Sequence, residues 1–343
     1  MSYGIASAAT ALLVASALTA LLRLVALRTG FTVRRIGRTG RRTPRLGGAA
    51  VATVTAAVTT VGASTGLAPL GAGTLTLLIA AGVVAALGFL DDVRPVGARA
   101  RVVVEAGAAT FVVHDAQLGF LVGALAVLWI VFVTNACRFI DTSDGVLGTV
   151  AVVTALGLSA CAAAGGLGPL AAILGVLAAA LTGFLMHNWY PARMHLGGCG
   201  SLFTGFLLAS AAVLVNAGHE ALSGAGSLFA VTVVVTADAA LVAVSRRRAG
   251  RLLFQGGADH IAHRLRRLGL TPTGVAVVLG VASLAGAVTA LLLHDGTLGP
   301  LAALWPVCAA AGSVAALLRV PVYGVRRRGH RPVRTAVVDV ARS

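Results

Sequence analysis

Apolar residues run in long blocks along this chain, and short polar segments separate the blocks. Each block holds about 20 mostly apolar residues, the length of an α-helix that crosses a lipid bilayer. The blocks and the turn residues between them predict about eleven transmembrane helices. Their expected ranges are 4–27, 47–66, 70–90, 102–114, 117–134, 145–164, 167–187, 201–217, 226–244, 273–293 and 299–320. The pattern therefore predicts an all-α fold, a polytopic membrane helical bundle.

The composition indicates a bilayer as the surroundings of this chain. Its 343 residues are 58% hydrophobic and only 11% charged, and the mean hydropathy is +0.93. A soluble domain needs polar side chains over its outer surface, and this chain has too few of them. No soluble domain interrupts the blocks, so we expect residues 1–343 to form a single integral-membrane domain. The first block lacks a basic leader and is long enough to span, so we expect a retained helix there.

Arginine alone supplies the positive charge, because the sequence contains no lysine and its net charge is +16. The arginines gather between alternate blocks, and the positive-inside rule places those segments in the cytoplasm. With 28–46 cytoplasmic, the N-terminus is expected outside and the C-terminus inside, where 321–343 forms a basic tail. This placement favours a multi-pass protein of the cell inner (cytoplasmic) membrane and argues against a nucleic-acid partner.

Two adjacent carboxylates, Asp91 and Asp92, end the third block on the expected cytoplasmic side. At a helix C-terminus they repel one another and oppose the helix dipole, so a divalent cation or an arginine is expected beside them. A solvated helix end paired with Arg94 or Arg99 is the alternative. Most other acidic residues lie on the same side, whereas a transporter more often holds ionisable residues near the bilayer midplane. This distribution predicts a site for a water-soluble substrate at the membrane surface.

A second polar segment lies between the fifth and sixth blocks. If residues 138–144 are helical, Arg138, Asp141 and Asp144 share one face at three-residue spacing. The alternative is that Ser143 or Asp144 only caps the helix that follows. The spacing alone does not decide between the two.

Two further segments combine glycine, histidine and arginine. The glycines of 197–200 precede a block and can present backbone N–H groups to an anion, although glycine is plentiful throughout the chain. In the longest cytoplasmic segment, His260 and His263 are three residues apart beside Arg264, which offers donors to a diphosphate. The alternative for the arginines is ordinary positive-inside charge.

Taken together and in this order, these segments resemble the polyprenyl-phosphate N-acetylhexosamine-1-phosphate transferase family, which is glycosyltransferase family 4. The likeness runs from Thr43-Pro44-Arg45 to Gly269, and each motif is weak when taken alone. It rests on Asp91-Asp92, Asn135-Ala136, Asp141, Asp144-Gly145, the stretch from Asn188 through Pro191-Ala192-Arg193 to Ser201, Asp238, and the Asp-His-x-x-His-Arg run at 259–264. That run is more similar to the N-acetylglucosamine-type bacterial branch than to the muramoyl-pentapeptide branch.

The resemblance implies transfer of N-acetylhexosamine-1-phosphate from a UDP-sugar to polyprenyl phosphate, with release of UMP, in cell-envelope polysaccharide or glycan biosynthesis. It implies Mg²⁺ as the cofactor, with Asp91 and Asp92 as metal ligands and, with Asp144, as catalytic residues. Substrate binding would involve Asn135, Arg138, Asp141, Asn188, Arg193, Asp259, His260, His263 and Arg264. Related transferases often dimerise, so the resemblance also leaves a homodimer open.

Three positions depart from the family pattern. Gly198 stands where the family typically has an aspartate, Arg138 replaces the second asparagine of Asn-x-x-Asn, and Thr142 replaces a glycine. Two groups near the expected metal are therefore missing, and we hypothesise that the Arg138 guanidinium partly substitutes for the metal against the diphosphate. The departures also leave open a catalytically degenerate relative that binds lipid phosphate or nucleotide sugar as an accessory protein. A polytopic transporter is the third alternative.

Overall fold

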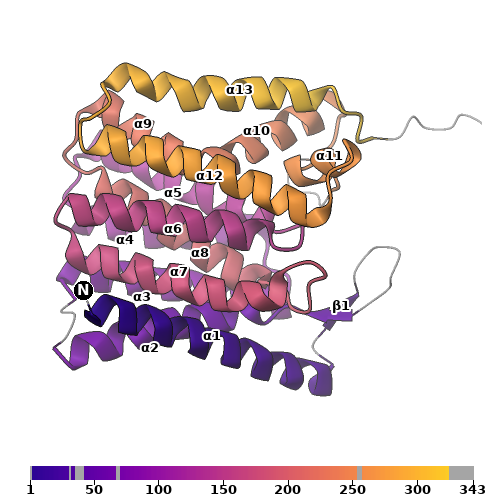
Figure 1. The fold of residues 1–343 in the computed structure, drawn as a ribbon, viewed down its shortest axis with the longest axis horizontal. Helices are drawn as coiled ribbons and strands as arrows, with labels where there is room; N and C mark the ends of the chain where they lie inside the picture. The colour runs from indigo at the N-terminus through magenta and orange to yellow at the C-terminus, as the bar shows by residue number, and fades with distance from the viewer. Residues whose placement is uncertain (1, 31, 35–41, 67–69, 253–256, 324–343) are drawn as a thin grey trace, which may run out of the picture.

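The computed structural model describes residues 2–30, 32–34, 42–66, 70–252 and 257–323, and most of them are helical (Figure 1). Most of the predicted basic tail therefore lies outside the described residues. A short antiparallel pair, β1 and β2, joins the first two helices. The elements are α1 (Ser2–Thr29), β1 (Thr32–Arg34), β2 (Arg42–Pro44), α2 (Gly47–Ser64), α3 (Ala72–Val93), α4 (Ala98–Asp115), α5 (Phe120–Ile140), α6 (Val146–Ala164), α7 (Gly168–Asn188), α8 (Gly197–Val215), α9 (Ala221–Val231), α10 (Val233–Arg248), α11 (Ile261–Arg267), α12 (Pro272–His294), the 3₁₀-helix η1 (Pro300–Ala303) and α13 (Leu304–Leu318).

The long helices lie side by side in a bundle, and α8 forms its centre (Figure 1). Within an 18-residue apolar stretch of each span, 94% of the residues are buried in α8, against 17% in α1 and 22% in the span formed by η1 and α13. Helices α2, α3, α5 and α6 pack around α8. The outer helices expose large apolar side chains such as Phe111, Leu121 and Trp305. Such apolar side chains suit a lipid environment. Polar side chains would not, because lipid chains offer them no hydrogen-bond partners.

The expectation of an all-α, multi-pass membrane bundle is confirmed. Among the described residues, nine helices are long and apolar enough to cross a membrane, and the pair α9 and α10, bent by 78°, makes a tenth if it counts as one span. The expected fourth segment is the 18-residue helix α4, which carries Arg101 and Glu105 and is not among the nine. The side of the membrane on which each terminus lies stays a prediction.

Several helix ends differ from the predicted ones, and two of these differences shape the candidate site. Helix α5 continues to Ile140, so Asn135 and Arg138 belong to it. The helix over 138–144 on which the shared face of Arg138, Asp141 and Asp144 depended does not form, because the chain leaves the helix at Asp141. Helix α8 begins at Gly197, four residues earlier than expected, so the glycine run forms its first turn. Apolar run length missed both ends because polar or glycine residues occupy these helical turns.

Glycine lets α2 and α3 approach the first turn of α8. A Cβ added to Gly88 would lie 2.6 Å from the carbonyl carbon of Gly198, and one on Gly48 would lie 2.6 Å from the carbonyl oxygen of Leu196. Because such contacts involve backbone atoms, a side chain at either position would push the helices apart. Close packing brings the end of α3 directly against the start of α8.

Candidate functional site

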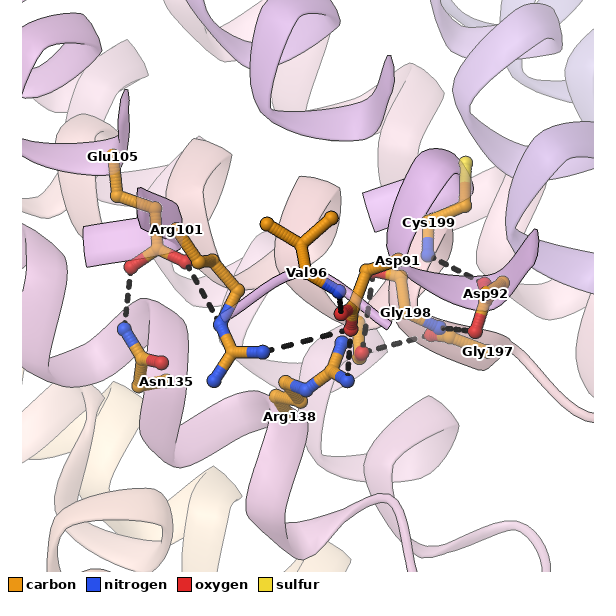
Figure 2. Close-up of polar contacts among 11 residues, drawn as sticks. Asp91, Asp92, Val96, Arg101, Glu105, Asn135, Arg138, Gly197, Gly198 and Cys199 are labelled. Carbon is orange, nitrogen blue, oxygen red and sulfur yellow. Dashed lines mark hydrogen bonds and ion pairs between the residues drawn. The ribbon is translucent and has the colours of Figure 1, made fainter. Parts of the chain in front are cut away.

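Polar side chains from α3, α4 and α5 meet the first turn of α8 at one end of the bundle (Figure 2). We call this group the carboxylate–guanidinium cluster, and it consists of Asp91, Asp92, Arg101, Glu105, Asn135 and Arg138 with the backbone of Gly198 and Cys199. The same helix end lies beside the strand pair, because the N–H of His195, shortly before α8, donates to the carbonyl of Pro44 in β2 at 3.0 Å.

Asp91 accepts hydrogen bonds on both of its carboxylate oxygens. Its Oδ1 accepts from the backbone N–H of Val96 at 2.8 Å. Its Oδ2 accepts from Nη2 of Arg138 and lies 3.5 Å from Nη1 of Arg101. The side chain of Asp91 is only 5% exposed, so two guanidinium groups neutralise a nearly buried carboxylate.

Asp92 caps the N-terminus of α8. Its Oδ1 accepts from the N–H of Gly198 at 2.9 Å and its Oδ2 accepts from the N–H of Cys199 at 3.0 Å. A carboxylate is favourable here, since the free N–H groups and the dipole of a helix N-terminus attract negative charge. The glycine run was expected to bind an anion through its backbone N–H groups. Two of these groups instead bind the carboxylate of Asp92 in the same chain.

Glu105 links the cluster to the interior of the bundle. It is fully buried; its Oε1 lies 3.8 Å from Nε of Arg101, and its Oε2 accepts from the amide of Asn135. Asn135 also donates to the carbonyl of Val131 in its own helix at 2.9 Å, so its amide nitrogen bonds both within α5 and to α4. Reasoning from the sequence missed Arg101 as a member of the site. The i,i+4 spacing of Arg101 and Glu105 within an otherwise apolar helix was the available signal.

The segment between α5 and α6 is tied to the segment between α7 and α8. Oδ2 of Asp144 accepts from the N–H of Ala192 at 3.1 Å. Asn188 accepts from the N–H of Gly145 at 3.0 Å and donates to the carbonyl of Met194 at 2.8 Å. Asp144 and Asn188, two of the predicted site residues, therefore hold these two segments together.

Asp141, directly after α5, lies close enough to the cluster to interact with it electrostatically. Burial raises the pKa of its carboxyl to about 7; Asp92 adds to the increase, and Arg45 and Arg138 oppose it. Asp141 therefore titrates near neutral pH. Arg193, which was predicted to bind substrate, is exposed in the segment before α8.

A second group, the histidine cluster, connects α10, α11 and the residues after α13. It consists of Asp238, Ser245, Arg246, Asp259, His260, His263, Arg264 and Tyr323. Asp238 accepts from the N–H of Ile261 at 2.7 Å, and its other oxygen lies 2.7 Å from Nδ1 of His260. His260 is 2% exposed, so Asp238 holds its ring in one orientation.

Asp259 and Arg264 fasten this cluster to the C-terminal end of α13. Arg246 donates twice to Asp259, at 2.7 and 2.9 Å, and the Tyr323 hydroxyl donates at 2.7 Å. Burial alone would raise the pKa of Asp259, but these donors outweigh it and lower the pKa to about 2. Arg264 donates to the carbonyls of Asp259, Leu317 and Val320 and to the hydroxyl of Ser245. Both residues were predicted to bind substrate, and in this geometry both are engaged by the protein.

His263 differs from its neighbours in the histidine cluster. Its ring centroid is 6.2 Å from that of His260, and its Nδ1 has no hydrogen-bond partner among the described residues. Burial lowers the pKa of His263, and the neighbouring His260 adds to that effect. His263 thus has a buried ring nitrogen that no described residue pairs, and its role in substrate binding stays a prediction. Helix α11 lies at the same end of the bundle as β1 (Figure 1).

The side chains do not fit the Mg²⁺ that the resemblance implies. Within the part of the chain that the structure describes, no group of three or more His, Cys, Asp or Glu is arranged to hold a metal ion. The oxygens of Asp91 and Asp92 face two guanidinium groups and three backbone N–H groups instead. Protein-bound Mg²⁺ usually takes one or two carboxylates together with waters and substrate phosphates, and here these donors already occupy the carboxylate oxygens of Asp91 and Asp92, so this arrangement does not suit the ion.

Comparison with known proteins places these elements in a family. Residues 74–216, which include most of α3 and all of α4 to α8, match the family model of glycosyl transferase family 4. A Streptomyces coelicolor protein, named as a candidate glycosyltransferase, is 52% identical over 97% of this chain and 83% of its own length. The chain therefore belongs to glycosyl transferase family 4, the family of the polyprenyl-phosphate sugar-1-phosphate transferases.

Two further relatives carry more specific names. A Bacillus subtilis protein, whose name assigns it as an undecaprenyl-phosphate N-acetylglucosaminyl 1-phosphate transferase, is 25% identical over 65% of this chain and 66% of its own length. A decaprenyl-phosphate N-acetylglucosaminephosphotransferase of Mycobacterium tuberculosis is 31% identical over 50% of this chain and 46% of its own length. The matched family model covers the carboxylate–guanidinium cluster and ends before the histidine cluster.

Proposed function

We propose that this protein transfers N-acetylhexosamine-1-phosphate from a UDP-sugar to polyprenyl phosphate at the cytoplasmic face of the inner membrane, in cell-envelope polysaccharide or glycan biosynthesis. An oxygen of the lipid phosphate attacks the sugar-linked phosphorus of the nucleotide sugar. The bond from that phosphorus to the oxygen of the other phosphate breaks, which yields a lipid-linked diphosphosugar and UMP. The names of the Bacillus and Mycobacterium relatives support this reaction.

The position of the carboxylate–guanidinium cluster carries this proposal. The polar side chains gather where α3, α5 and α8 begin or end, within the range that matches the family model. One substrate would arrive from the bilayer and the other from water, so a site at the ends of spanning helices is accessible to both. Arg94 after α3, Arg99 at the start of α4 and Arg193 before α8 lie at this same end of the helices, which favours the cytoplasmic face.

Phosphoryl transfer depends mostly on positioning and on neutralising phosphate charge. In the proposed reaction Arg138 faces the diphosphate, and Asp91 holds the guanidinium in place. Asp92 orders the first turn of α8, while Asp144 and Asn188 hold the neighbouring segments. His263 supplies a nitrogen for a phosphate oxygen or a hydroxyl of the substrate.

A transfer assay in membranes tests the proposal. Membranes that contain the protein are incubated with polyprenyl phosphate and UDP-sugars labelled in the sugar, and label in the organic phase is counted. The proposal predicts lipid-linked label, reduced on the order of 10²-fold by Asp91→Asn, because Asp91 holds the Arg138 guanidinium in place and a positioned charge at a reacting phosphate contributes about that much. Glu220→Gln is the matched control, because Glu220 is an exposed carboxylate at the opposite ends of the helices. Absence of lipid-linked label with every UDP-sugar would contradict the proposal.

One observation favours a second candidate, an accessory protein that binds the nucleotide sugar or the lipid phosphate without reaction. All three carboxylates expected to act in catalysis, Asp91, Asp92 and Asp144, already accept hydrogen bonds from the protein. This candidate predicts saturable binding of a labelled UDP-sugar to the purified protein with no label passing into lipid. The two assays together separate it from the transferase.

A further inference from the structure

We propose that Arg138 takes the place of a divalent cation in this protein, so that guanidinium groups bind the substrate diphosphate without metal. The proposal deepens the proposed function and rests on it for the nature of the ligand, a diphosphate. Three features of the described residues carry it: the charges around Asp91, the space beside Gly198 and the exposure of Arg138.

The charges around Asp91 are already those that a metal ion would supply. Arg138 and Arg101 both face Oδ2 of Asp91, and Val96 donates to Oδ1. A cation placed at this carboxylate would lie close to two guanidinium groups, and like charges at such distances in a partly buried site repel strongly. A diphosphate in the same place would instead be attracted by both groups.

The backbone of Gly198 leaves the space that the guanidinium occupies. A Cβ at this position would lie 2.6 Å from Nη1 of Arg138 and 3.1 Å from Oδ1 of Asp92. A longer side chain would therefore displace the arginine. The absence of a side chain at 198 therefore leaves room for the guanidinium of Arg138.

Arg138 is also more exposed than the three charged side chains joined to it through Asp91 and Arg101. Its side chain is 26% exposed, against 8% for Arg101, 5% for Asp91 and 0% for Glu105. Its Nη1 has no hydrogen-bond partner among the described residues. A buried guanidinium N–H without an acceptor is costly, and a small shift of the side chain toward a phosphate oxygen would satisfy it. Bidentate contact with phosphate is the geometry that arginine favours.

The test measures binding of inorganic pyrophosphate to the purified full-length protein in detergent, by calorimetry, in buffer with EDTA and in buffer with Mg²⁺. The proposal predicts saturable binding in EDTA, with a Kd within about threefold of the value in Mg²⁺. Binding that requires Mg²⁺, or no binding in either buffer, would overturn it. This comparison uses the unaltered protein, so it does not depend on whether a variant folds.

Two variants then assign the effect to Arg138. Arg138→Asn should weaken pyrophosphate binding in EDTA at least tenfold, whereas Arg138→Lys, which keeps the charge and loses the fork of donors, should weaken it less. Adding Gly198→Asp to Arg138→Asn should make binding depend on Mg²⁺. Equal binding by the parent and by a folded Arg138→Asn variant would contradict the assignment.

Failure of this inference and failure of the proposed function give different results. Transfer from a UDP-sugar combined with Mg²⁺-dependent pyrophosphate binding would leave the transferase and remove the metal-free site. Pyrophosphate binding in EDTA without transfer would support the metal-free site and favour the accessory role.

Discussion

Arg138 of α5 donates a hydrogen bond to Asp91 of α3, so one ion pair joins the ends of two helices that both pack against α8. The pair is asymmetric, because Asp91 is 5% exposed and Arg138 is 26% exposed. Loss of the arginine would leave a nearly buried carboxylate with Arg101 as its remaining cationic partner at 3.5 Å. The pair therefore contributes to the stability of this end of the bundle as well as to the proposed binding.

A double-mutant cycle measures that contribution. Arg138→Ala should destabilise the protein by about 2 kcal/mol, less than the ~3–5 kcal/mol for breaking a fully buried pair, because water and Arg101 compensate in part. In the Asp91→Asn background the same change should cost at least about 1 kcal/mol less, since no buried charge is then left unpaired. Unfolding by SDS in mixed micelles gives the four stabilities. Additive effects of the two substitutions would contradict the coupling.

Close packing of α3 on α8 yields a second prediction, with a control on the same helix. Gly88→Ala should destabilise the protein by about 1–3 kcal/mol, because the new methyl group would overlap the backbone of Gly198. Gly82→Ala should change stability by no more than about 1 kcal/mol, since no atom lies within 4 Å of its Cβ position and alanine favours the helix. The same SDS titration compares the two. Equal effects would show that α3 and α8 are not in backbone contact at Gly88.

The pKa of Asp259 predicts a pH dependence of stability. Its pKa of about 2 lies below the ordinary value of 3.8, so the ionised carboxylate stabilises the folded state. That contribution is complete above about pH 4 and is lost as the pH falls from about 4 to about 2. Stability should therefore decrease between pH 4.5 and pH 2.5 by less in Asp259→Asn than in the parent. An unchanged pH dependence in this variant would contradict the assignment.

Tyr323 is expected to contribute to the same interaction from the end of the described chain. Tyr323→Phe removes one donor to Asp259 and should cost about 1 kcal/mol at neutral pH. It should also raise the pKa of Asp259 and so reduce the loss of stability on acidification. Tyr190→Phe is the control, since its side chain is 46% exposed in the segment after α7. Identical stability of Tyr323→Phe and the parent at neutral pH would show that this hydroxyl does not hold the histidine cluster.

The orientation inferred from the arginines can be measured by cysteine labelling. The exposed Cys308 is first replaced by serine, because Cys137, Cys161 and Cys199 are buried. In that background, Glu220→Cys should react with an impermeant maleimide in intact cells, and Arg94→Cys should react only after the membrane is opened. The reverse pattern would place the candidate site outside the cytoplasm.

The sequence predicted the bundle well because membrane spans require long apolar runs, which are visible without tertiary information. It predicted poorly where polar residues continue a helix, as at Asn135 and Arg138 in α5, because run length underestimates such helices. The contact of Asp92 with Gly198 joins positions 106 residues apart, and local patterns do not reveal contacts over such separations.

The roles of individual polar residues were the least predictable part. Arg264 and the histidines are adjacent in sequence, yet Arg264 is directed to carbonyls at the end of α13 while His263 keeps an unused nitrogen. Asp91 was expected beside a metal ion or a nearby arginine, and the arginine that it contacts most closely comes from another helix. Residue type indicated that phosphate chemistry was plausible here, but only the fold shows which donors the protein already uses.

The identity of the released nucleotide tests the central claim most directly. Purified protein is supplied with polyprenyl phosphate and a UDP-sugar, and the nucleotide products are separated and quantified beside the lipid product. The account predicts one UMP for each sugar that reaches the lipid, because the sugar-linked phosphate is transferred together with the sugar. Release of UDP in proportion to the lipid product, or a lipid product that carries only one phosphate, would contradict it.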